Sequence, residues 1–157
     1  MRAVVQRVRD ASVTVDGAIT GRIDLGLLAY IGIERSDTVS DAAYLATKIA
    51  GLRIFPDEAG RMNLPLAAVE ATTADGSRVG ILAISQFTLL ADVRKGRRPS
   101  YNAAAPPEAA HTLYLDVVER LRAAGLTVET GVFQAHMDVR SVNDGPVTLL
   151  VDSNKRF

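Results

Sequence analysis

The residues best able to do chemistry lie where an apolar stretch gives way to a polar one. Ser85, Gln86, Phe87 and Thr88 follow the apolar run 79–84 and precede a basic segment. Hydroxyl and amide groups at a strand end can hold a polar substrate or stabilise an oxyanion, and an aromatic ring can stack on a nucleobase. The residue types alone fit an ordinary strand end with surface polar groups equally well.

A second unusual segment is the corner Asn-Asp-Gly-Pro at residues 143–146, which lies between two apolar stretches. X-Pro bonds are cis in about 5–6% of folded cases, and turn-forming residues between strands raise that chance. On composition alone a plain turn is the simpler interpretation. A cis Gly145-Pro146 bond and a plain turn both stay open at this point.

Several chemical classes are excluded by what the sequence lacks. It has no cysteine, which removes disulfides, thiol nucleophiles and thiolate metal sites. It also has no P-loop, no dinucleotide-binding glycine motif and no Gly-x-Ser-x-Gly elbow. His111 and His136 are not spaced as a metal-ligand pair, and we expect both to be exposed. An enzyme of this composition would act without a metal, a thiol or an obvious histidine base, although a Ser-His-Asp triad stays open because geometry defines it.

The charged residues balance, with 18 Lys and Arg against 18 Asp and Glu. A chain without net charge can bind a polyanion only through a local basic patch. Residues 94–98 are the candidate, because four of the five are cations: Arg94, Lys95, Arg97 and Arg98. This segment either contacts phosphates or is a solvated charged loop.

Strands dominate the elements that must position these residues. Alternation, apolar runs and turn signals such as Asp16-Gly17 predict strands at residues 3–8, 11–16, 18–23, 26–33, 52–55, 79–89 and 147–151, with one or two more within 127–142. The runs 26–33 and 79–89 are almost wholly apolar, which favours central strands covered on both faces. The corner 143–146 is expected to interrupt the last strands.

Two main helices are expected. Asp37 or Thr38 can cap a helix over 39–50, and a second helix begins near Pro107 and ends near Gly125. Residues 57–63 and 70–78 have the composition of a turn and an exposed loop. These elements predict an α/β (α+β-like) fold in one domain, residues 1–157, with a mostly antiparallel or mixed sheet. No signal peptide or transmembrane span is evident, so a cytoplasmic protein without membrane contact is expected.

Four segments carry a family resemblance. They are MRAVVQRV, LRIFPDEAGRMN, SQFTLLADVRKGRRPS and VNDGPVTLLVDS. Together they resemble the D-aminoacyl-tRNA deacylase (D-tyrosyl-tRNA(Tyr) deacylase) family, nearly end to end from Met1 to about Ser153. The resemblance implies the deacylase fold and hydrolysis of the ester that links a D-amino acid, or glycine, to the 3′ end of tRNA. It implies no cofactor and no metal.

The resemblance also implies a homodimer whose active sites lie at the subunit interface. Gly145-Pro146 would then be cis and would reach into the partner's pocket, excluding L-amino acids by steric contact. Arg7 matches the arginine that holds this motif. Alternation supports that role, because Arg7 shares an apolar face with Ala3 and Val5 and needs a polar partner there, which a backbone carbonyl can supply.

The substrate-facing motif of the family matches Ser85, Gln86, Phe87 and Thr88. Phe87 would stack on the terminal adenine, and backbone N–H groups near Phe87 and Thr88 would stabilise the oxyanion. The vicinal 2′-OH of the ribose would assist the attacking water. Thr88 as a nucleophile is an alternative, but the sequence offers no base to activate it.

This sequence departs from the family pattern at Gln134, where a glycine is usual. If that position has a positive φ, glutamine strains it. Met137 still matches a pocket residue, and alternation points it inward. The segment between Val69 and Val79 is longer than usual. Two other functions compete: a non-enzymatic RNA-binding module, and a hydrolase of a different small ester or amide.

Overall fold

The computed structural model describes residues 1–73 and 76–156 and centres on one six-stranded mixed sheet. The strands run in the order β2-β1-β3-β6-β7, and β8 pairs with β1. β1 pairs antiparallel with β2, β3 and β8, whereas β3, β6 and β7 are parallel. The strand bounds are β1 (Arg2–Val15), β2 (Ala18–Ile23), β3 (Leu25–Gly32), β6 (Val79–Ser85), β7 (Val128–Thr130) and β8 (Asp138–Asp152). The predicted mixed sheet is confirmed.

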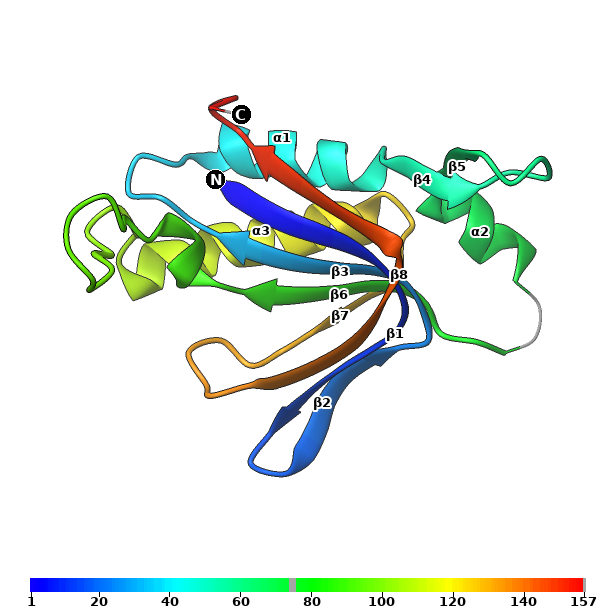
Figure 1. Ribbon diagram of the computed structural model, residues 1–157, viewed down its shortest axis with the longest axis horizontal. Coiled ribbons are helices and arrows are strands. Elements are labelled where there is room, and N and C mark those ends of the chain that lie inside the picture. Colours follow the sequence, from blue (N-terminus) through cyan, green and yellow to red (C-terminus); the bar gives the residue numbers. More distant parts are fainter. Residues whose placement is uncertain (74–75, 157) are drawn as a thin grey trace.

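The two predicted main helices, α1 (Val39–Ala50) and α3 (Pro107–Ala123), lie beside each other along one face of the sheet (Figure 1). α1 begins in a capping box between Thr38 and Asp41, so the backbone N–H groups of its first turn have side-chain partners. Its buried residues, Ala42, Leu45, Ala46 and Ile49, follow helical spacing and pack into the main core.

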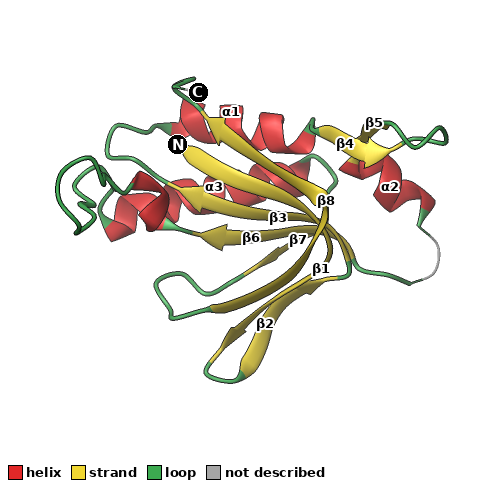
Figure 2. Cartoon of the chain, viewed as in Figure 1, coloured by secondary structure: helices red, strands yellow, loops and turns green. Residues whose placement is uncertain are grey.

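A second, smaller core lies on the other face of the sheet, where β1, β2 and β8 curl away from the helices (Figure 2). It combines side chains from the centre of the sheet with side chains from the curl, namely Leu28, Leu82 and Ile84 with Val8, Ala11, Val13 and Ile23. β3 and β6 are therefore buried on both faces, as their apolar runs predict.

β1 corrects the prediction of two strands at 3–8 and 11–16, because it is continuous. Ala3 and Val5 face the main core and Val8 faces the second core, as regular alternation predicts, but Ala11 and Val13 then face the second core as well. The pairing with β8 shifts register between Val8 and Asp10, where two steps along β1 match one along β8, and this bulge moves the alternation of β1 to the other face. A broken pattern in the sequence thus marks a bulged strand and not a turn.

β8 corrects the predicted interruption at 143–146. The strand stays paired with β1 on both sides of the corner, with Asn143 opposite Val8 and Thr148 opposite Gln6. Six residues of β8, 143–148, therefore span the same stretch as three of β1, 6–8, and the surplus forms a bulge that contains Gly145-Pro146. A proline is compatible with a strand at such a bulge because no ladder N–H is needed there.

Three further expectations need correction. The predicted turn at 57–63 runs into β5 (Met62–Pro65), which pairs with β4 (Arg53–Pro56). The predicted loop at 70–78 overlaps a short helix, α2 (Leu66–Thr72), and its residues 74–75 lie outside the described residues. The predicted strand at 79–89 ends at Ser85, and a 3₁₀ turn, η1 (Phe87–Leu90), follows it.

Candidate active site

A cavity of about 640 Å³ opens at the carboxyl ends of the parallel strands β3 and β6. Ligands bind at this end of parallel strands in open α/β sheets, and the volume lies within the range of small-molecule sites. Most of the lining is apolar or aromatic, with Ile31, Ile33, Ile84, Phe133, Ala135 and Met137 among its residues. Among the described residues that line it, Arg35 is the one permanent cation and no carboxylate is present.

η1 forms one edge of this cavity and is held against β3. The backbone N–H of Gln86 donates to the carbonyl of Ile31 at 2.8 Å. Gly32 makes the approach possible: a Cβ there would lie 2.6 Å from Cδ2 of Leu90 and 2.9 Å from the carbonyl oxygen of Gln86. The chain therefore turns into η1 because β3 offers it a bare backbone at that point.

The structure brings three of the four predicted motif residues to the cavity. Ser85, Gln86 and Phe87 line it, and Thr88 does not. Thr88 is exposed, and its hydroxyl accepts a hydrogen bond from the Gln86 side-chain amide at 2.5 Å. The first N–H groups of a helical turn have no acceptor within that turn, so the start of η1 offers donors beside the cavity.

Tyr101 is a cavity residue that the sequence prediction missed. Its ring meets the ring of Phe87 edge-on, with centroids 5.1 Å apart, and both side chains are exposed, Phe87 by 58% and Tyr101 by 38%. The segment after Tyr101 is pinned to the end of β3, where Ala105 N–H donates to the carbonyl of Ile33 at 2.9 Å. The sequence feature that could have identified Tyr101 is its place next to a basic segment in a chain with few aromatic residues.

Another part of the cavity lining comes from α3 and the segment before β8. Phe133 stacks against His111 with ring centroids 4.5 Å apart. Tyr114 lies behind it, where burial raises the pKa of the phenol to about 12 and its hydroxyl donates to the carbonyl of Ala83 at 2.9 Å. His111 and His136 are both exposed, as predicted, although His136 also lines the cavity.

Met137 and Gln134 stand in the same wall. Met137 is half-buried and lines the cavity, as alternation predicts. Gln134 also lines it and has φ of 64°, in the left-handed region. A non-glycine residue in this region strains the backbone, as expected for Gln134 at a position with positive φ.

Arg7 and the Gly145-Pro146 corner form a separate group outside the cavity lining. The Gly145-Pro146 peptide bond is cis, and Gly145 has φ of 122°. Arg7 Nη1 donates to the carbonyl of Ile54 at 2.5 Å, and its Nε lies 2.8 Å from Oδ2 of Asp144. The sequence predicted a backbone carbonyl as the partner of Arg7. It did not predict the ion pair with Asp144, because only the β1–β8 register places Asp144 beside Arg7.

The corner is far from its own chain's cavity. Val139 is the last residue of β8 that lines the cavity, and the corner begins at Asn143, about 13 Å further along the strand. Gly145 and Pro146 are both exposed. Leu150 and Val142 of the same strand are exposed too, by 62% and 52%.

The basic segment 94–98 adjoins the cavity rim. Its stem is closed by Asp92 and Ser100, whose backbones exchange two hydrogen bonds of 2.8 and 2.9 Å. Arg94 pairs with Asp92 at 2.7 Å, and this contact lowers the pKa of the Asp92 carboxyl. Among the described residues, no group of three or more His, Cys, Asp or Glu side chains gathers as a metal site.

A sequence model of the family described as D-Tyr-tRNA(Tyr) deacylase matches residues 4–152. The chain belongs to this family. Among relatives of the family, the D-aminoacyl-tRNA deacylases of Koribacter versatilis and Alkaliphilus metalliredigens are 57% and 53% identical over 157 residues, covering the whole of both chains in each case. The deacylase resemblance inferred from the four segments is confirmed.

Two solved structures extend the deacylase comparison. One, named c-Myc DNA Unwinding Element Binding Protein, is 37% identical with a TM-score of 0.86 and covers 97% of this chain and 98% of its own. Another, described as a probable eukaryotic D-amino acid tRNA deacylase, has a TM-score of 0.78, covers 96% and 97%, and at 16% identity supports the fold alone. Within the described residues of this deacylase-family chain, no helix is long and apolar enough to cross a membrane.

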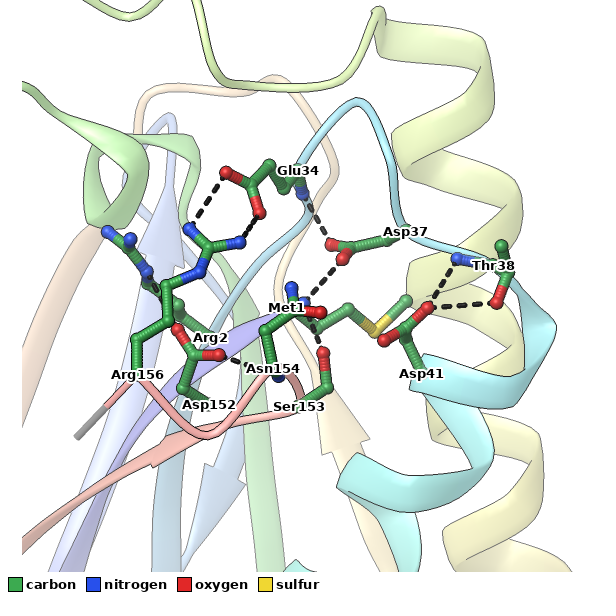
Figure 3. Close-up of polar contacts among 10 residues, drawn as sticks. All are labelled: Met1, Arg2, Glu34, Asp37, Thr38, Asp41, Asp152, Ser153, Asn154 and Arg156. Carbon is green, nitrogen blue, oxygen red and sulfur yellow. Dashed lines mark hydrogen bonds and ion pairs between the residues drawn. The ribbon is translucent and has the colours of Figure 1, made fainter.

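In this deacylase-family chain a polar cluster joins the two ends of the chain to the segment before α1 (Figure 3). Arg2 donates through Nη1 to the carbonyl of Leu89 at 3.0 Å and through Nε to the buried Asp152 at 3.2 Å. The same cluster holds the Met1 α-amino group 2.6 Å from Asp37 and 2.7 Å from the Ser153 hydroxyl. The end of η1 is thus tied to both ends of the chain.

Glu34 completes that cluster. Its carboxylate pairs with the Arg156 guanidinium through two contacts, one of them 2.9 Å between Nη1 and Oε1. This pairing lowers the pKa of Glu34. Glu34 also bridges to Ala104 at the cavity rim, so the cluster supports the rim as well as η1.

Proposed function

We propose that this protein hydrolyses the ester that joins a D-amino acid to the 3′-terminal adenosine of tRNA. The observation that carries the proposal is the full-length deacylase match combined with a cavity lined by three residues of the Ser85–Thr88 motif. Free tRNA and a D-amino acid are the products. The tRNA that becomes mischarged with a D-amino acid is in the cytoplasm, which is where we place the protein.

The terminal adenosine would bind in the cavity between Phe87 and the wall that contains Phe133. Both rings line the cavity, and stacking of a base on an aromatic side chain contributes about 1–3 kcal/mol. The absence of carboxylates from the described lining favours a substrate that carries phosphates. These features support the nucleoside as the fixed end of the substrate.

Hydrolysis at this site would proceed by direct attack of water on the ester carbonyl. The water oxygen bonds to the acyl carbon and the carbonyl oxygen becomes an oxyanion beside the N–H donors that begin η1. The bond between the acyl carbon and the ribose oxygen then breaks, and the ribose oxygen takes a proton that the water gave up. Loss of one such donor typically costs about 10²–10³ in rate. The neighbouring 2′-OH of the ribose is the group we assign to assist the water, and positioning supplies much of the acceleration.

Thr88 as a nucleophile is the weaker route. Thr88 does not line the cavity, and its hydroxyl accepts a hydrogen bond from Gln86, which is no base. A threonine nucleophile needs a general base to remove its proton. We therefore assign Thr88 to binding or to the conformation of η1.

Selectivity would require a second copy of the chain. Gly145 and Pro146 are exposed and lie outside the cavity of their own chain, so they reach a cavity only if another subunit brings them there. Their rigid main chain would crowd an L side chain and leave a D side chain free. Exposed Leu150 and Val142 on the same strand support burial in a symmetric homodimer.

Glycine has no side chain to exclude, so glycyl-tRNA is a further expected substrate. This includes glycine mischarged on tRNA(Ala). Steric exclusion by Gly145 and Pro146 acts on the side chain alone, so the glycyl ester would enter the cavity and be hydrolysed.

Assays with three substrates distinguish a deacylase from a general esterase and from a nucleic-acid-binding module. We would measure ester loss from D-tyrosyl-tRNA, from glycyl-tRNA and from a D-tyrosine methyl ester. Turnover of both tRNA esters, without turnover of the methyl ester, supports the deacylase. Turnover of the methyl ester at a similar rate would favour a general esterase. Binding of nucleic acid without ester loss would favour a binding module, the kind of function for which the 37% identical protein is named.

Mixed dimers test the cross-subunit arrangement. One variant carries Gly145→Ala and Pro146→Ala and should keep ester hydrolysis but lose its preference for the D ester; the other carries Phe87→Ala and Gln86→Ala and should have little activity. In purified mixed dimers the one intact cavity faces the intact corner of the other subunit if the corner acts across the interface, so the preference for the D ester returns. Mixed dimers that hydrolyse the L ester as fast as the D ester would place both groups in one chain and contradict the proposal.

A further inference from the structure

The segment 94–98 combines strong positive charge with a fixed position at the cavity rim. It leaves η1 and returns at Tyr101, whose ring contacts Phe87, so it projects from directly beside the two rim aromatics. The backbone pair Asp92–Ser100 closes its stem, and the ion pair of Arg94 with Asp92 stiffens it. The loop is therefore anchored close to any ligand that occupies the cavity.

Three of its cations are available to a ligand. Lys95, Arg97 and Arg98 are exposed, and within residues 1–73 and 76–156 none of them has an ion pair or a side-chain hydrogen bond. Arg94 differs, because Asp92 already neutralises it. Three like charges within four residues repel one another unless an anion lies between them. An anionic partner would relieve that repulsion.

We propose that Lys95, Arg97 and Arg98 bind the phosphates of the tRNA 3′ strand that precede the terminal nucleoside. The inference rests on the proposed function, which places that nucleoside in the cavity. Its 5′ phosphate must then leave across the rim, where the loop adds three exposed cations to Arg35, the one permanent cation among the described lining residues. The chain has no net charge, so this local patch supplies the attraction that the molecule as a whole lacks.

If the loop binds these phosphates, its removal should affect two substrates differently. D-tyrosyl-tRNA carries the preceding phosphates, whereas 3′-O-D-tyrosyl-adenosine carries only the terminal nucleoside and the same ester. The loop should matter for the first substrate and not for the ester chemistry itself. Each phosphate contact also contributes about 0.7–1 to the slope of log KM against log salt concentration.

The test compares two double variants that each remove two exposed cations. Arg97→Ala with Arg98→Ala alters the loop, and Lys48→Ala with Arg61→Ala is the matched control on α1 and before β5. We expect the loop variant to lower the ratio of kcat/KM for the tRNA ester to kcat/KM for the adenosine ester by about tenfold, and to reduce the salt slope by about 1.4. The control should change neither quantity.

Two results would overturn the assignment of the loop. An equal loss on both substrates would mean that the change damaged the cavity, and an unchanged kcat/KM on both substrates would mean that the loop does not bind phosphates. Wild-type protein that hydrolyses neither ester would instead remove the proposed function. The two failures are therefore distinguishable in the same set of assays.

Discussion

Arg7 Nε lies 2.8 Å from Oδ2 of Asp144, and this ion pair joins β1 to β8 directly beside Gly145. The Arg7 side chain is only 11% exposed and that of Asp144 19%. A Cβ on Gly145 would lie 3.2 Å from Arg7 Nη2, so the guanidinium also packs against the glycine backbone. The position of the corner is therefore set by a shielded charge pair between its own Asp144 and Arg7 of β1.

Arg7→Met should destabilise the fold and loosen the corner. It keeps the apolar stem but leaves Asp144 short of a shielded partner, which costs about 2 kcal/mol of unfolding free energy. Arg9→Met is the matched control, because Arg9 contacts the same carboxylate at 2.8 Å but is 73% exposed and should cost less than about 0.5–1 kcal/mol. Urea unfolding measures both, and equal losses would contradict a special role for Arg7.

Phe87→Ala should weaken substrate binding without weakening the fold. Phe87 is 58% exposed, so its removal should change stability by less than about 0.5 kcal/mol. Loss of one stacked base would lower kcat/KM for the D-aminoacyl ester about 5- to 150-fold. Phe87→Tyr keeps an aromatic face and should retain most of the activity. If Phe87→Ala and Phe87→Tyr behaved alike, stacking would not be the role of this ring.

Gln134→Gly should stabilise the protein or leave its stability unchanged. Gln134 has φ of 64°, a conformation that costs a non-glycine residue about 1–2 kcal/mol and costs glycine little. The gain is reduced because glycine makes the unfolded chain more flexible. Thermal unfolding of Gln134→Gly and Gln134→Ala separates the two effects. A glycine variant less stable than the alanine variant would show that the side chain, and not the backbone, matters here.

The Glu34–Arg156 pair should contribute stability only above acidic pH. Pairing lowers the pKa of Glu34 from its ordinary 4.5, so its stabilisation is fully present above that pH and is lost as the pH falls through the lowered pKa. Glu34→Gln should therefore cost about 0.5–1 kcal/mol at pH 7 and almost nothing near pH 2–3. Unfolding measured at both pH values checks this. A cost that did not vary with pH would rule out the ion pair as its source.

The sequence predicted those parts of the fold that local patterns determine. Alternation placed Arg7 on an apolar face and Met137 toward the cavity, and apolar runs identified β3 and β6 as central strands. What it could not predict depends on pairing between distant segments. The partner of Arg7 at Asp144 follows from the β1–β8 register, and the bulge that makes β8 continuous follows from the same register.

In the candidate site, too, the sequence predicted what local patterns determine and missed what depends on distant segments. Gln86 and Phe87 stood out because polar groups ended an apolar run, but η1 was predicted as strand. The turn into η1 depends on Gly32, which is more than fifty residues away and has no side chain to block Leu90. Tyr101 is brought to Phe87 by the Asp92–Ser100 stem, a contact that no periodicity indicates.

Chirality tests the central claim most directly. We would mix D-tyrosyl-tRNA and L-tyrosyl-tRNA, each with a different label on the amino acid, and follow the loss of both esters in one reaction. The proposed filter predicts that the D ester is lost faster by at least about 100-fold, the ratio that a clash of roughly 3 kcal/mol would give. Equal rates for the two esters would contradict it.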